Sequence, residues 1–537
     1  MMIKQIFFYV LLASSLMAQN QEFNVNWTPY ITYNANNTGD FEQFIGADDK
    51  LVYAYFTPST KKAMHNEVYL SAYNKKTMSK ASSMLVHCPN DIKYVRMSKE
   101  SIYIITEHYA DQNVEVGCMT LNSAFKTIVP HKIIFKQKVA GKLFASLQNK
   151  VSTNAKANDY LYLMSEKQVV KNEKMKVEYL ILDGELNIIN AGQQELPVIA
   201  LSNASNGTTN FTIGDDGMIV IKNQVKADKE TREQEKIYSY ALLTAINPLN
   251  KSSYTLPIRA SGKDIEDYIY SSEKNRLTIY GFYTGKDDRG KFNGEKGIFV
   301  TTYNTLTNSI DQTAFIKVKG YDADFETISL DRLKKHADGS VTLIGGESEN
   351  IIIQSKNGTS YTNRKGDIYV ANITKNGELR WEKTLSRYIT YSELYVDDLQ
   401  VAEHDNNLYI VYADQFTRKE KKKAAVMGDN RSKKDMRDFL SYYTLNLNNG
   451  QSAKKELKLN AGNEMADNMR SVNSSRITVF DDAFYLDGFN TNIKSGVTAL
   501  ACGTACLLGA GCIYYNIKTN NGSAYTGGGS LGSISFK

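Results

Sequence analysis

What this sequence lacks excludes several classes of function. The formal net charge is only +6 over 537 residues, which is too small a basic excess to suggest nucleic-acid binding. The six histidines stand singly, and no His-x-x-x-His or Cys-x-x-Cys spacing indicates a metal site. Neither a Gly-x-Ser-x-Gly elbow nor a glycine-rich phosphate loop occurs. The sequence therefore predicts no metal, no cofactor and no nucleic-acid partner.

Helical periodicity is also missing. Beyond the first eighteen residues, no segment keeps apolar residues at i, i+3, i+4 and i+7 over three turns. Proline occurs 7 times and tryptophan twice, whereas the chain contains 35 tyrosines and 21 phenylalanines. Aromatic residues are favoured on half-buried pleated sheets. This composition predicts an almost wholly β protein.

Residues 1–18 have the features of a secretory signal peptide. Lys4 supplies a positive start, residues 6–12 form a short apolar core, and Ala18 offers a small residue at the cleavage point. The alternative is an uncleaved anchor, but the apolar run is too short to cross a bilayer of about 30 Å. We therefore expect an exported protein, located in the periplasm, at the periphery of the outer membrane or outside the cell.

Export bears on the five cysteines, because some of them should pair in an oxidising compartment. An odd number leaves at least one free or joined to another molecule, and the spacing does not decide which. The disulfide candidates are Cys88, Cys118, Cys502, Cys506 and Cys512.

A repeat organises the rest of the chain. Eight times, a polar turn rich in Asp, Asn and Gly leads into a short apolar strand, as expected for hairpin turns that need a positive φ. The strands begin at Leu51, Ile102, Tyr160, Met218, Leu277, Val341, Leu408 and Phe484. A second hairpin recurs in these units, for example at residues 68–77, 298–307, 368–377, 440–450 and 513–522. Two hairpins give about four strands per unit.

Four strands per repeat are the content of one propeller blade, and the pattern resembles the β-propellers over nearly the whole mature chain. No specific subfamily is indicated, because the Trp-Asp, kelch and sialidase signatures are absent. The resemblance implies a single propeller of eight blades over residues 41–537, with residues 19–40 as a lead-in. Seven blades are the alternative if the third or eighth unit is not a blade. An array of two-sheet sandwiches is less suitable, because a closed ring protects strand edges.

The last four units are longer than the others, and the extra residues fall between the second and third strands. The insertions are residues 285–296, 348–366, 415–438 and 490–511. Equivalent links in a propeller lie on one face, and insertions in repeats commonly form the binding face. We therefore expect blades five to eight to build an elaborated wall on one side of the ring.

Residues 418–438 concentrate the basic charge. They contain nine Lys or Arg and four acids, a net charge of +5 (9 minus 4). The mature chain also carries +5, because Lys4 leaves with the signal, so the remainder is neutral overall. Such a loop attracts an acidic partner, anionic lipid or polysaccharide, although a solvated loop that only confers solubility has the same composition. The binding candidates are Arg418, Lys419, Lys421, Lys422, Lys423, Arg431, Lys433, Lys434 and Arg437.

Residues 496–515 have the opposite character, because they contain no charged residue. The length would span a bilayer as a helix, but four glycines disfavour a helix by about 1 kcal/mol each. We expect a packed loop closed by a disulfide among its three cysteines. A membrane span and an exposed apolar patch that contacts a partner are the alternatives.

Asp287 and Asp288 are the candidates for catalysis, since they lie in an insertion rather than in a repeated hairpin turn. A pair of carboxylates is the catalytic equipment of glycoside hydrolases. The leading interpretation is nevertheless a non-catalytic, exported binding or scaffold propeller of the cell envelope. Its loop face would engage a protein, a glycan or an anionic membrane surface. The alternatives are a carbohydrate-active enzyme, either a hydrolase or a lyase, and an adhesive surface protein with an extended repeat array.

Overall fold

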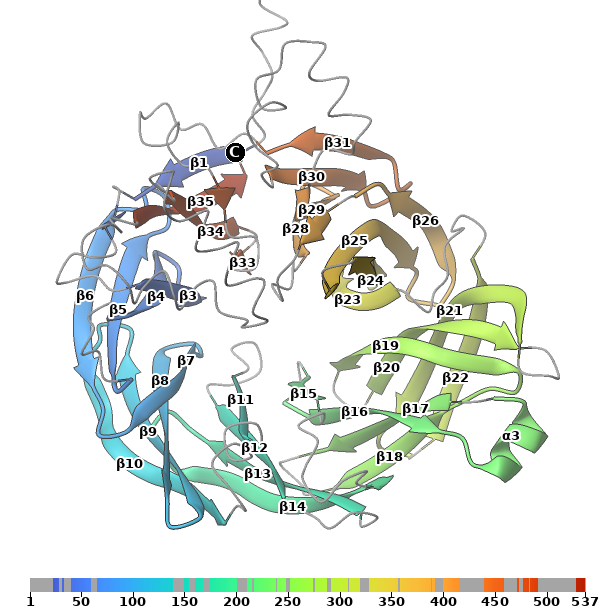
Figure 1. Ribbon diagram of the computed structural model, residues 1–537, viewed down its shortest axis with the longest axis horizontal. Helices are drawn as coiled ribbons and strands as arrows, with labels where there is room; N and C mark the ends of the chain where they lie inside the picture. The colour runs from blue at the N-terminus through green and yellow to red at the C-terminus, as the bar shows by residue number, and fades with distance from the viewer. Residues whose placement is uncertain are drawn as a thin grey trace, which may run out of the picture.

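The computed structural model describes most of the repeat region. The described residues are 23–28, 31–32, 40–58, 65–138, 149–153, 160–167, 174–199, 210–214, 217–237, 239–247, 252–273, 276–286, 291–307, 309–318, 328–355, 358–387, 389–391, 399–414, 439–457, 471–472, 477–481, 483–490 and 528–536. They form eight antiparallel sheets arranged in a ring around a central axis (Figure 1). The protein is an eight-bladed β-propeller, as the repeat predicts, and the seven-bladed and sandwich alternatives are wrong.

Blades one to four each contain four strands, which run in sequence order from the centre of the ring outward. These strands are β3 (Asp40–Ala47), β4 (Leu51–Thr57), β5 (Glu67–Asn74) and β6 (Lys80–His87); β7 (Asp91–Met97), β8 (Ser101–Ala110), β9 (Asn113–Asn122) and β10 (Thr127–Lys138); β11 (Asn149–Thr153), β12 (Leu161–Lys167), β13 (Lys174–Leu182) and β14 (Ile188–Ile199); and β15 (Asn210–Ile213), β16 (Ile219–Lys226), β17 (Ser239–Ile246) and β18 (Ser253–Ile258).

Blades five to seven follow the same order, with a short extra strand in blade six. The strands are β19 (Lys263–Glu273), β20 (Arg276–Lys286), β21 (Phe292–Asn304) and β22 (Ser309–Lys317); β23 (Ile328–Lys335), β24 (Val341–Ser355), β25 (Gly358–Ile373), β26 (Leu379–Leu385) and the extra β27 (Ile389–Tyr391); and β28 (Gln400–His404), β29 (Asn407–Asp414), β30 (Phe439–Asn446) and β31 (Ser452–Glu456).

The eight strands that the sequence marks by their turns are the second strands of the eight blades. The first seven are β4, β8, β12, β16, β20, β24 and β29, and each begins within one residue of its predicted start. The eighth is β34 (Ala483–Asn490) of blade eight. Four of the described turns have the positive φ that their composition predicts, as at Asp405 (47°) and Asn406 (59°) before β29, whereas residues 48–50 and 98–100 turn without one.

Blade eight closes the ring with strands from both ends of the chain. Its inner strands β32 (Ser471–Val472) and β33 (Thr478–Phe480) pair with β34, and β34 pairs with β35 (Gly528–Phe536). The outermost strand is β1 (Phe23–Trp27), in register from Phe23 opposite Phe536 to Trp27 opposite Gly532. The lead-in expected over residues 19–40 therefore contains a blade strand, and also β2 (Ile31–Thr32). The strand expected over residues 513–522 lies outside the described residues.

The core of the molecule lies between blades rather than within one layer. The described buried side chains form eight clusters, and each joins two neighbouring blades. Strands in the middle of a blade are buried on both faces, as in β8, whereas outer strands such as β6 and β31 are largely exposed. Tyr485 of blade eight packs against Phe44 of blade one, with ring centroids 5.5 Å apart, which completes the circle.

One short helix, α3 (Lys229–Glu235), lies in the link between β16 and β17 of blade four. Asp228 caps its N-terminus by accepting a 2.7 Å hydrogen bond from the backbone N–H of Thr231. The helix has no buried residue and is too short for a three-turn apolar pattern, so the sequence gives no sign of it. In the described part of the chain, no helix is long and apolar enough to cross a membrane.

Candidate functional site

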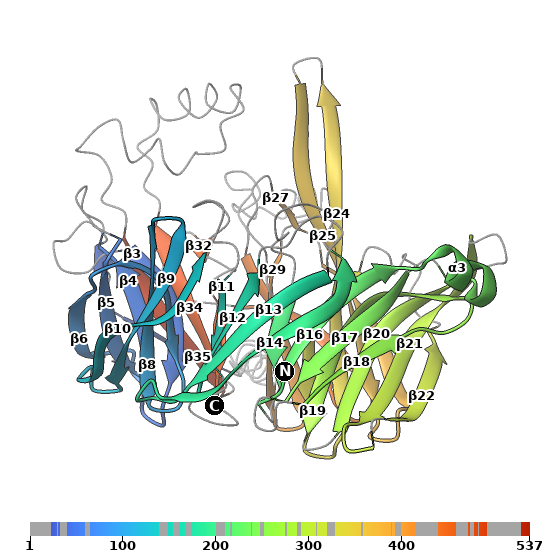
Figure 2. The same ribbon diagram turned by 90° about the horizontal axis from the view of Figure 1, so that it is seen from below.

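The most distinctive feature of the ring is a β-hairpin that projects from blade six. We call residues Ser348–Lys365 the arm. The two strands remain paired from Ser348 opposite Lys365 to Ser355 opposite Gly358, and they rise well beyond the other blades (Figure 2). The insertion expected at residues 348–366 is therefore present between the second and third strands, but it continues the strands instead of forming a loop.

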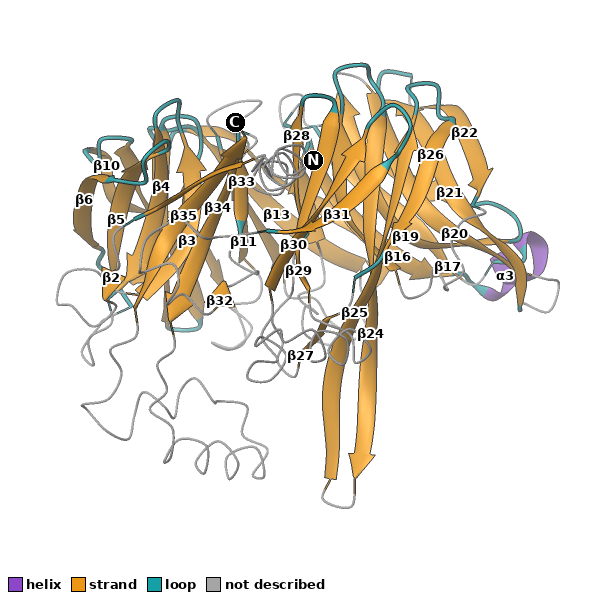
Figure 3. Cartoon of the chain, turned by 90° about the horizontal axis from the view of Figure 1, so that it is seen from above, coloured by secondary structure: helices purple, strands orange, loops and turns teal. Residues whose placement is uncertain are grey.

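The insertion of blade five is built in the same way. Strand β20 runs to Lys286, which pairs with Phe292 at the start of β21, so only residues 287–291 lie between the paired ends. The short turns gather on the opposite face of the ring (Figure 3). One face therefore carries the second-to-third links, which range from the two-residue turn at Asp111–Gln112 in blade two to the arm of blade six, and the other face carries the remaining turns within the blades.

A buried arginine fixes the base of the arm. Arg387 is 3% exposed, and its Nε donates a 2.9 Å hydrogen bond to the carbonyl of Gly366. Its backbone N–H donates to Asp367 Oδ1 at 3.3 Å. Just beyond it, β27 pairs with β25 over Asn363–Lys365. The segment after blade six thus returns to hold one strand of the arm where it leaves the ring.

The inner strand of blade six places a carboxyl beside this arginine. Asp331 accepts a 2.8 Å hydrogen bond from Ser329 Oγ. Burial raises the pKa of the Asp331 carboxyl, although Ser329, Lys365 and Arg387 oppose the shift. A side chain at Gly346 would come within 2.8 Å of Asp331 Oδ2 and 2.9 Å of Arg387 Nη2, so the glycine makes room for the pair. A carboxyl with a raised pKa is a feature of catalytic acids as well as of buried structural groups.

Blade seven adds a second charged pair next to the segment that contains Arg387. Lys454 of β31 contacts Asp414 at 2.6 Å, and Asp414 is only 3% exposed. The Lys454 ammonium also donates to the Ser386 carbonyl at 3.3 Å and lies 5.8 Å from the ring centre of Tyr412. Burial raises the pKa of the Tyr412 hydroxyl well above its ordinary value. These contacts tie blade seven to the segment that anchors the arm.

Several sequence-predicted site residues lie outside the described residues. They are the nine basic residues of 418–438, Asp287, Asp288, Cys502, Cys506 and Cys512. Their assignments stay predictions, as does the signal peptide over residues 1–18.

The other two cysteines are described. Cys88 and Cys118 are free thiols, and they are buried in two successive interblade clusters. Burial raises the pKa of both thiols, that of Cys88 to about 11. They are therefore apolar core residues with little thiolate character.

A polar pocket of about 240 Å³ opens between blades five and six on the turn face. Blade five contributes Arg276 and the hydroxyl-bearing residues Thr278 and Thr302, among others, while blade six contributes its two turns around Gly339 and Lys375. The side-chain amide of Gln312 donates to the carbonyl of Asn376 at 3.4 Å and bridges the two blades beside the pocket. The sequence does not indicate this pocket, because its walls come from four separate segments of two blades.

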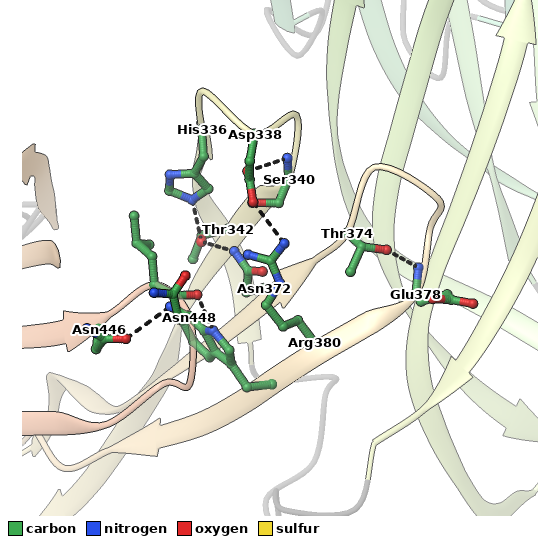
Figure 4. A network of polar contacts seen from close by, with 12 residues as sticks. His336, Asp338, Ser340, Thr342, Asn372, Thr374, Glu378, Arg380, Asn446 and Asn448 are labelled. Carbon is green, nitrogen blue, oxygen red and sulfur yellow. Dashed lines mark hydrogen bonds and ion pairs between the residues drawn. The ribbon is translucent and has the colours of Figure 1, made fainter. Parts of the chain in front are cut away.

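A histidine in the wall of the pocket links blade six to blade seven. His336 Nδ1 lies 2.8 Å from Glu403 Oε2, and its Nε2 lies 2.7 Å from Thr342 Oγ1. Asn372 Nδ2 donates to the same hydroxyl at 3.0 Å (Figure 4). Both ring nitrogens therefore have a partner, Nδ1 on Glu403 and Nε2 on the threonine hydroxyl, which also accepts from Asn372. The histidine is thereby fixed by its protein partners.

The turn that follows is braced by a second carboxylate. Asp338 accepts from the backbone N–H of Ser340 at 2.9 Å, from its hydroxyl at 2.6 Å, and from Arg380 at 2.8 Å (Figure 4). These bonds hold the pKa of Asp338 well below its usual range. Neighbouring turns are closed by side chains too, as where Thr374 Oγ1 accepts from the N–H of Glu378. The rim of the pocket is therefore preformed.

In the described part of the chain, no three His, Cys, Asp or Glu side chains lie close enough together to hold a metal ion. Asp267, on the inner strand of blade five, is ion-paired with Lys222 at 3.1 Å, and it also accepts from the backbone N–H of Leu330. Leu330 precedes Asp331, so the two carboxyls belong to adjacent inner strands.

Comparison with known proteins adds no family. No protein-family model and no curated protein matches the chain. Among solved structures, the chain is similar to BamB from Moraxella catarrhalis at 11% identity, covering 86% of this chain and 96% of that one with a TM-score of 0.36. It is similar to the β-propeller domain of the Trilobed protease from Pyrococcus furiosus at 12% identity, covering 80% and 98%, TM-score 0.35. The WD40 domain of SCAP from fission yeast follows at 6% identity, covering 96% and 99%, TM-score 0.37. Likeness at this level says nothing about function.

Proposed function

We propose that this protein is a non-catalytic binding propeller, exported to the cell envelope, whose arm-bearing face holds a partner protein. The arm is the observation that carries the proposal. A two-stranded ribbon has no core of its own and is marginally stable in water, yet this one extends far beyond the blades. A second protein that covers it would supply the burial that the ribbon lacks.

The edges of the arm are suited to pairing with another strand. In the described residues, β27 covers the edge of β25 only at Asn363–Lys365, and β23 covers the edge of β24 only as far as Glu347. No described strand pairs with either edge farther out, so a strand added by a partner would meet backbone donors and acceptors there. This mode of binding takes affinity from the main chain and specificity from alternate side chains.

The sequence of the arm supports the same reading. Residues 350–355 read Asn-Ile-Ile-Ile-Gln-Ser, with no charge and no proline. Exposed edge strands are ordinarily protected by lysine, proline or a bulge, because β-branched, uncharged segments aggregate when uncovered. A run of three isoleucines on this projecting strand is explained if a partner protein pairs with it in the cell.

The test shortens the arm but keeps the blade strands and two of the three residue pairs between β25 and β27. Residues 350–363 are replaced by Asn-Gly, so that a two-residue hairpin turn joins Glu349 to Arg364, its partner on the opposite strand. A second variant, Ile352→Lys, keeps the ribbon but places a charge on it. Ile310→Lys is the matched control, because Ile310 is 51% exposed on the outer strand β22, away from the arm. Partners are cross-linked in native cells and recovered on the tagged full-length chain.

We expect one partner protein to be recovered with the native chain and with Ile310→Lys, and to be lost with the shortened arm and with Ile352→Lys. Circular dichroism should show the native β content in all variants. Recovery of the same proteins with all four chains would refute the arm as the docking element.

The basic residues of 418–438 have a separate role in this proposal, as an electrostatic contact with the envelope. Fractionated cells should retain the protein in the envelope pellet at low salt and release it at high salt, because such contacts are screened. Replacing the five cationic residues at 418–423 with alanine should abolish the retention. If the protein is found only in the soluble fraction at low salt, the electrostatic contact with the envelope is wrong. Binding of free glycans would then be tested instead.

A carbohydrate-active enzyme is the second candidate, and Asp331 is the observation that favours it. Its carboxyl pKa is raised by burial, as in a general acid, and Asp267 of the next blade accepts a hydrogen bond from the backbone N–H of the preceding residue, Leu330. Release of reducing sugar from envelope polysaccharides, lost in Asp331→Asn, would establish this activity. If neither the native chain nor Asp331→Asn releases reducing sugar, the carbohydrate-active enzyme is excluded as a candidate.

A further inference from the structure

The pocket between blades five and six carries chemistry that the arm does not use. It lies on the turn face, since β24 leaves the pocket at Val341 and ends at Ser355 near the tip of the arm. Whatever it binds is therefore separated from the arm by the thickness of the ring.

Three cationic residues line the pocket, and its described lining contains no Asp or Glu. Arg276 belongs to blade five, while Lys335 and Lys375 belong to blade six. A guanidinium presents paired donors that match the two oxygens of a carboxylate or phosphate, and the ammonium groups add charge without fixed geometry. The wall therefore selects for an anion.

Carboxylates close to this wall are already occupied by other groups. Asp338 accepts from Ser340 and Arg380, and Glu403 pairs with His336. The hydrogen bonds and ion pairs just named join these acids to residues of blade six. These two acids next to the wall are therefore paired with Arg380 and His336, and neither of them lines the pocket.

The rest of the lining consists largely of hydroxyl-bearing residues. Ser271, Thr278 and Thr302 come from blade five, and Ser340 and Thr374 come from blade six. Gly339 adopts a positive φ of 79°, so the turn backbone comes close to the pocket without a side chain in the way. The volume of about 240 Å³ is smaller than the roughly 300 to 1,000 Å³ of sites for drug-sized ligands, which limits the occupant to a small molecule or one sugar unit.

We infer that this pocket binds a small sugar bearing one anionic group, either the carboxylate of a sugar acid or the phosphate of a sugar phosphate. Arg276 holds the anionic group, Lys335 and Lys375 contribute charge, and the serine and threonine hydroxyls exchange hydrogen bonds with those of the sugar. The braced turn around Asp338 keeps this arrangement formed in the empty protein, so little ordering is needed on binding.

The experiment measures binding of glucuronate, glucose 6-phosphate, inorganic phosphate and glucose to the full chain by isothermal titration calorimetry. Arg276→Ala and Lys375→Ala remove exposed cations, so neither should disturb folding, and their unfolding temperatures are checked. Lys76→Ala is the matched control, because Lys76 occupies the equivalent exposed turn of blade one, far from the pocket.

We expect at least one of the two sugar anions to bind, and glucose not to bind measurably. The tighter of the two identifies carboxylate or phosphate as the natural group. Arg276→Ala should weaken binding about tenfold or more, Lys375→Ala by a smaller factor, and Lys76→Ala not at all. Inorganic phosphate binding as tightly as glucose 6-phosphate would overturn the sugar part of the inference. Equal binding of glucose, or unchanged binding in Arg276→Ala, would overturn the site.

Discussion

The closure of the ring by its N-terminal strand leads to a quantitative prediction for Phe23→Ala. Phe23 is 3% exposed and packs edge-on against Tyr409 and Tyr442, with centroids 5.6 and 5.1 Å away. It also faces Phe536 across the strand pair. Truncating a buried phenylalanine costs about 3–5 kcal/mol, of which each edge-on ring contact contributes roughly 0.5–1.5. A terminal strand can shift to fill part of the space more easily than a central one. We therefore expect the free energy of unfolding to fall by about 3 kcal/mol, at the low end of this range.

The assay is urea unfolding of the full chain combined with hydrogen exchange. With a slope of about 3 kcal/mol/M, a loss of about 3 kcal/mol lowers the urea midpoint by about 1 M. Exchange should rise in β35, whose outer hydrogen bonds are made with β1, and stay unchanged in blades three to five. Phe292→Ala is the matched control, since Phe292 is 47% exposed and should change stability by no more than about 0.5 kcal/mol.

A Phe23→Ala chain that unfolds at the native midpoint, with native exchange in β35, would refute closure by β1. Faster exchange in every blade would also be informative, because it would mean that one seam controls the stability of the whole ring. We expect the local result, since each core cluster joins only two blades.

Three further results are expected. His336→Ala leaves the buried hydroxyl of Thr342 without its ring partner and should lower the free energy of unfolding by about 1–3 kcal/mol, whereas a native melting curve would show that the link between the blades is not stabilising. Burial raises the pKa of folded Asp331 above its unfolded value, so its ionisation destabilises the fold at neutral pH; Asp331→Asn should therefore be more stable than the native chain at pH 7, with an advantage that disappears as the pH falls below about 4. Iodoacetamide at pH 8 should leave Cys88 and Cys118 unmodified in the native protein and alkylate both in urea, and native labelling of either would contradict their burial.

The repeat could be found from the sequence because its signal is local. The turns before the second strands contain residues that tolerate a positive φ, and Asp405, Asn406, Gly339 and Gly217 adopt one in the structure. A short apolar strand after such a turn is detectable without knowledge of its neighbours. The number of blades then follows from counting, even though the spacing between units drifts.

The closing strand and the arm were not visible in the same way. β1 pairs with β35 across more than five hundred residues, and nothing in the sequence of residues 23–27 names that partner. Residues 348–366 were recognised as an insertion, but polar residues such as Asn350 and Thr362 interrupt the alternation that indicates strands. Their pairing depends on the register that the blade below imposes.

The contacts between blades were the least predictable part. His336 and Glu403 are 67 residues apart, and each looks like an isolated surface residue in the sequence. The pocket likewise requires Arg276 of one blade to face Lys375 of the next. Such pairs depend on the rotation between adjacent blades, which no local pattern encodes.

Blade six carries both proposed sites, and its strands decide whether they are independent. β24 starts at the pocket and ends near the tip of the arm, and β25 returns to Ile373, beside the pocket residue Thr374. Coupling between two sites requires an element with two arrangements that both ligands bias. The paired strands cross a tightly packed blade and are pinned by Arg387 on one face and by His336 on the other, so the described contacts offer one arrangement. Shortening the arm should therefore leave the affinity of the pocket for a sugar anion within about twofold, and a tenfold change would mean that the hairpin slides as a unit.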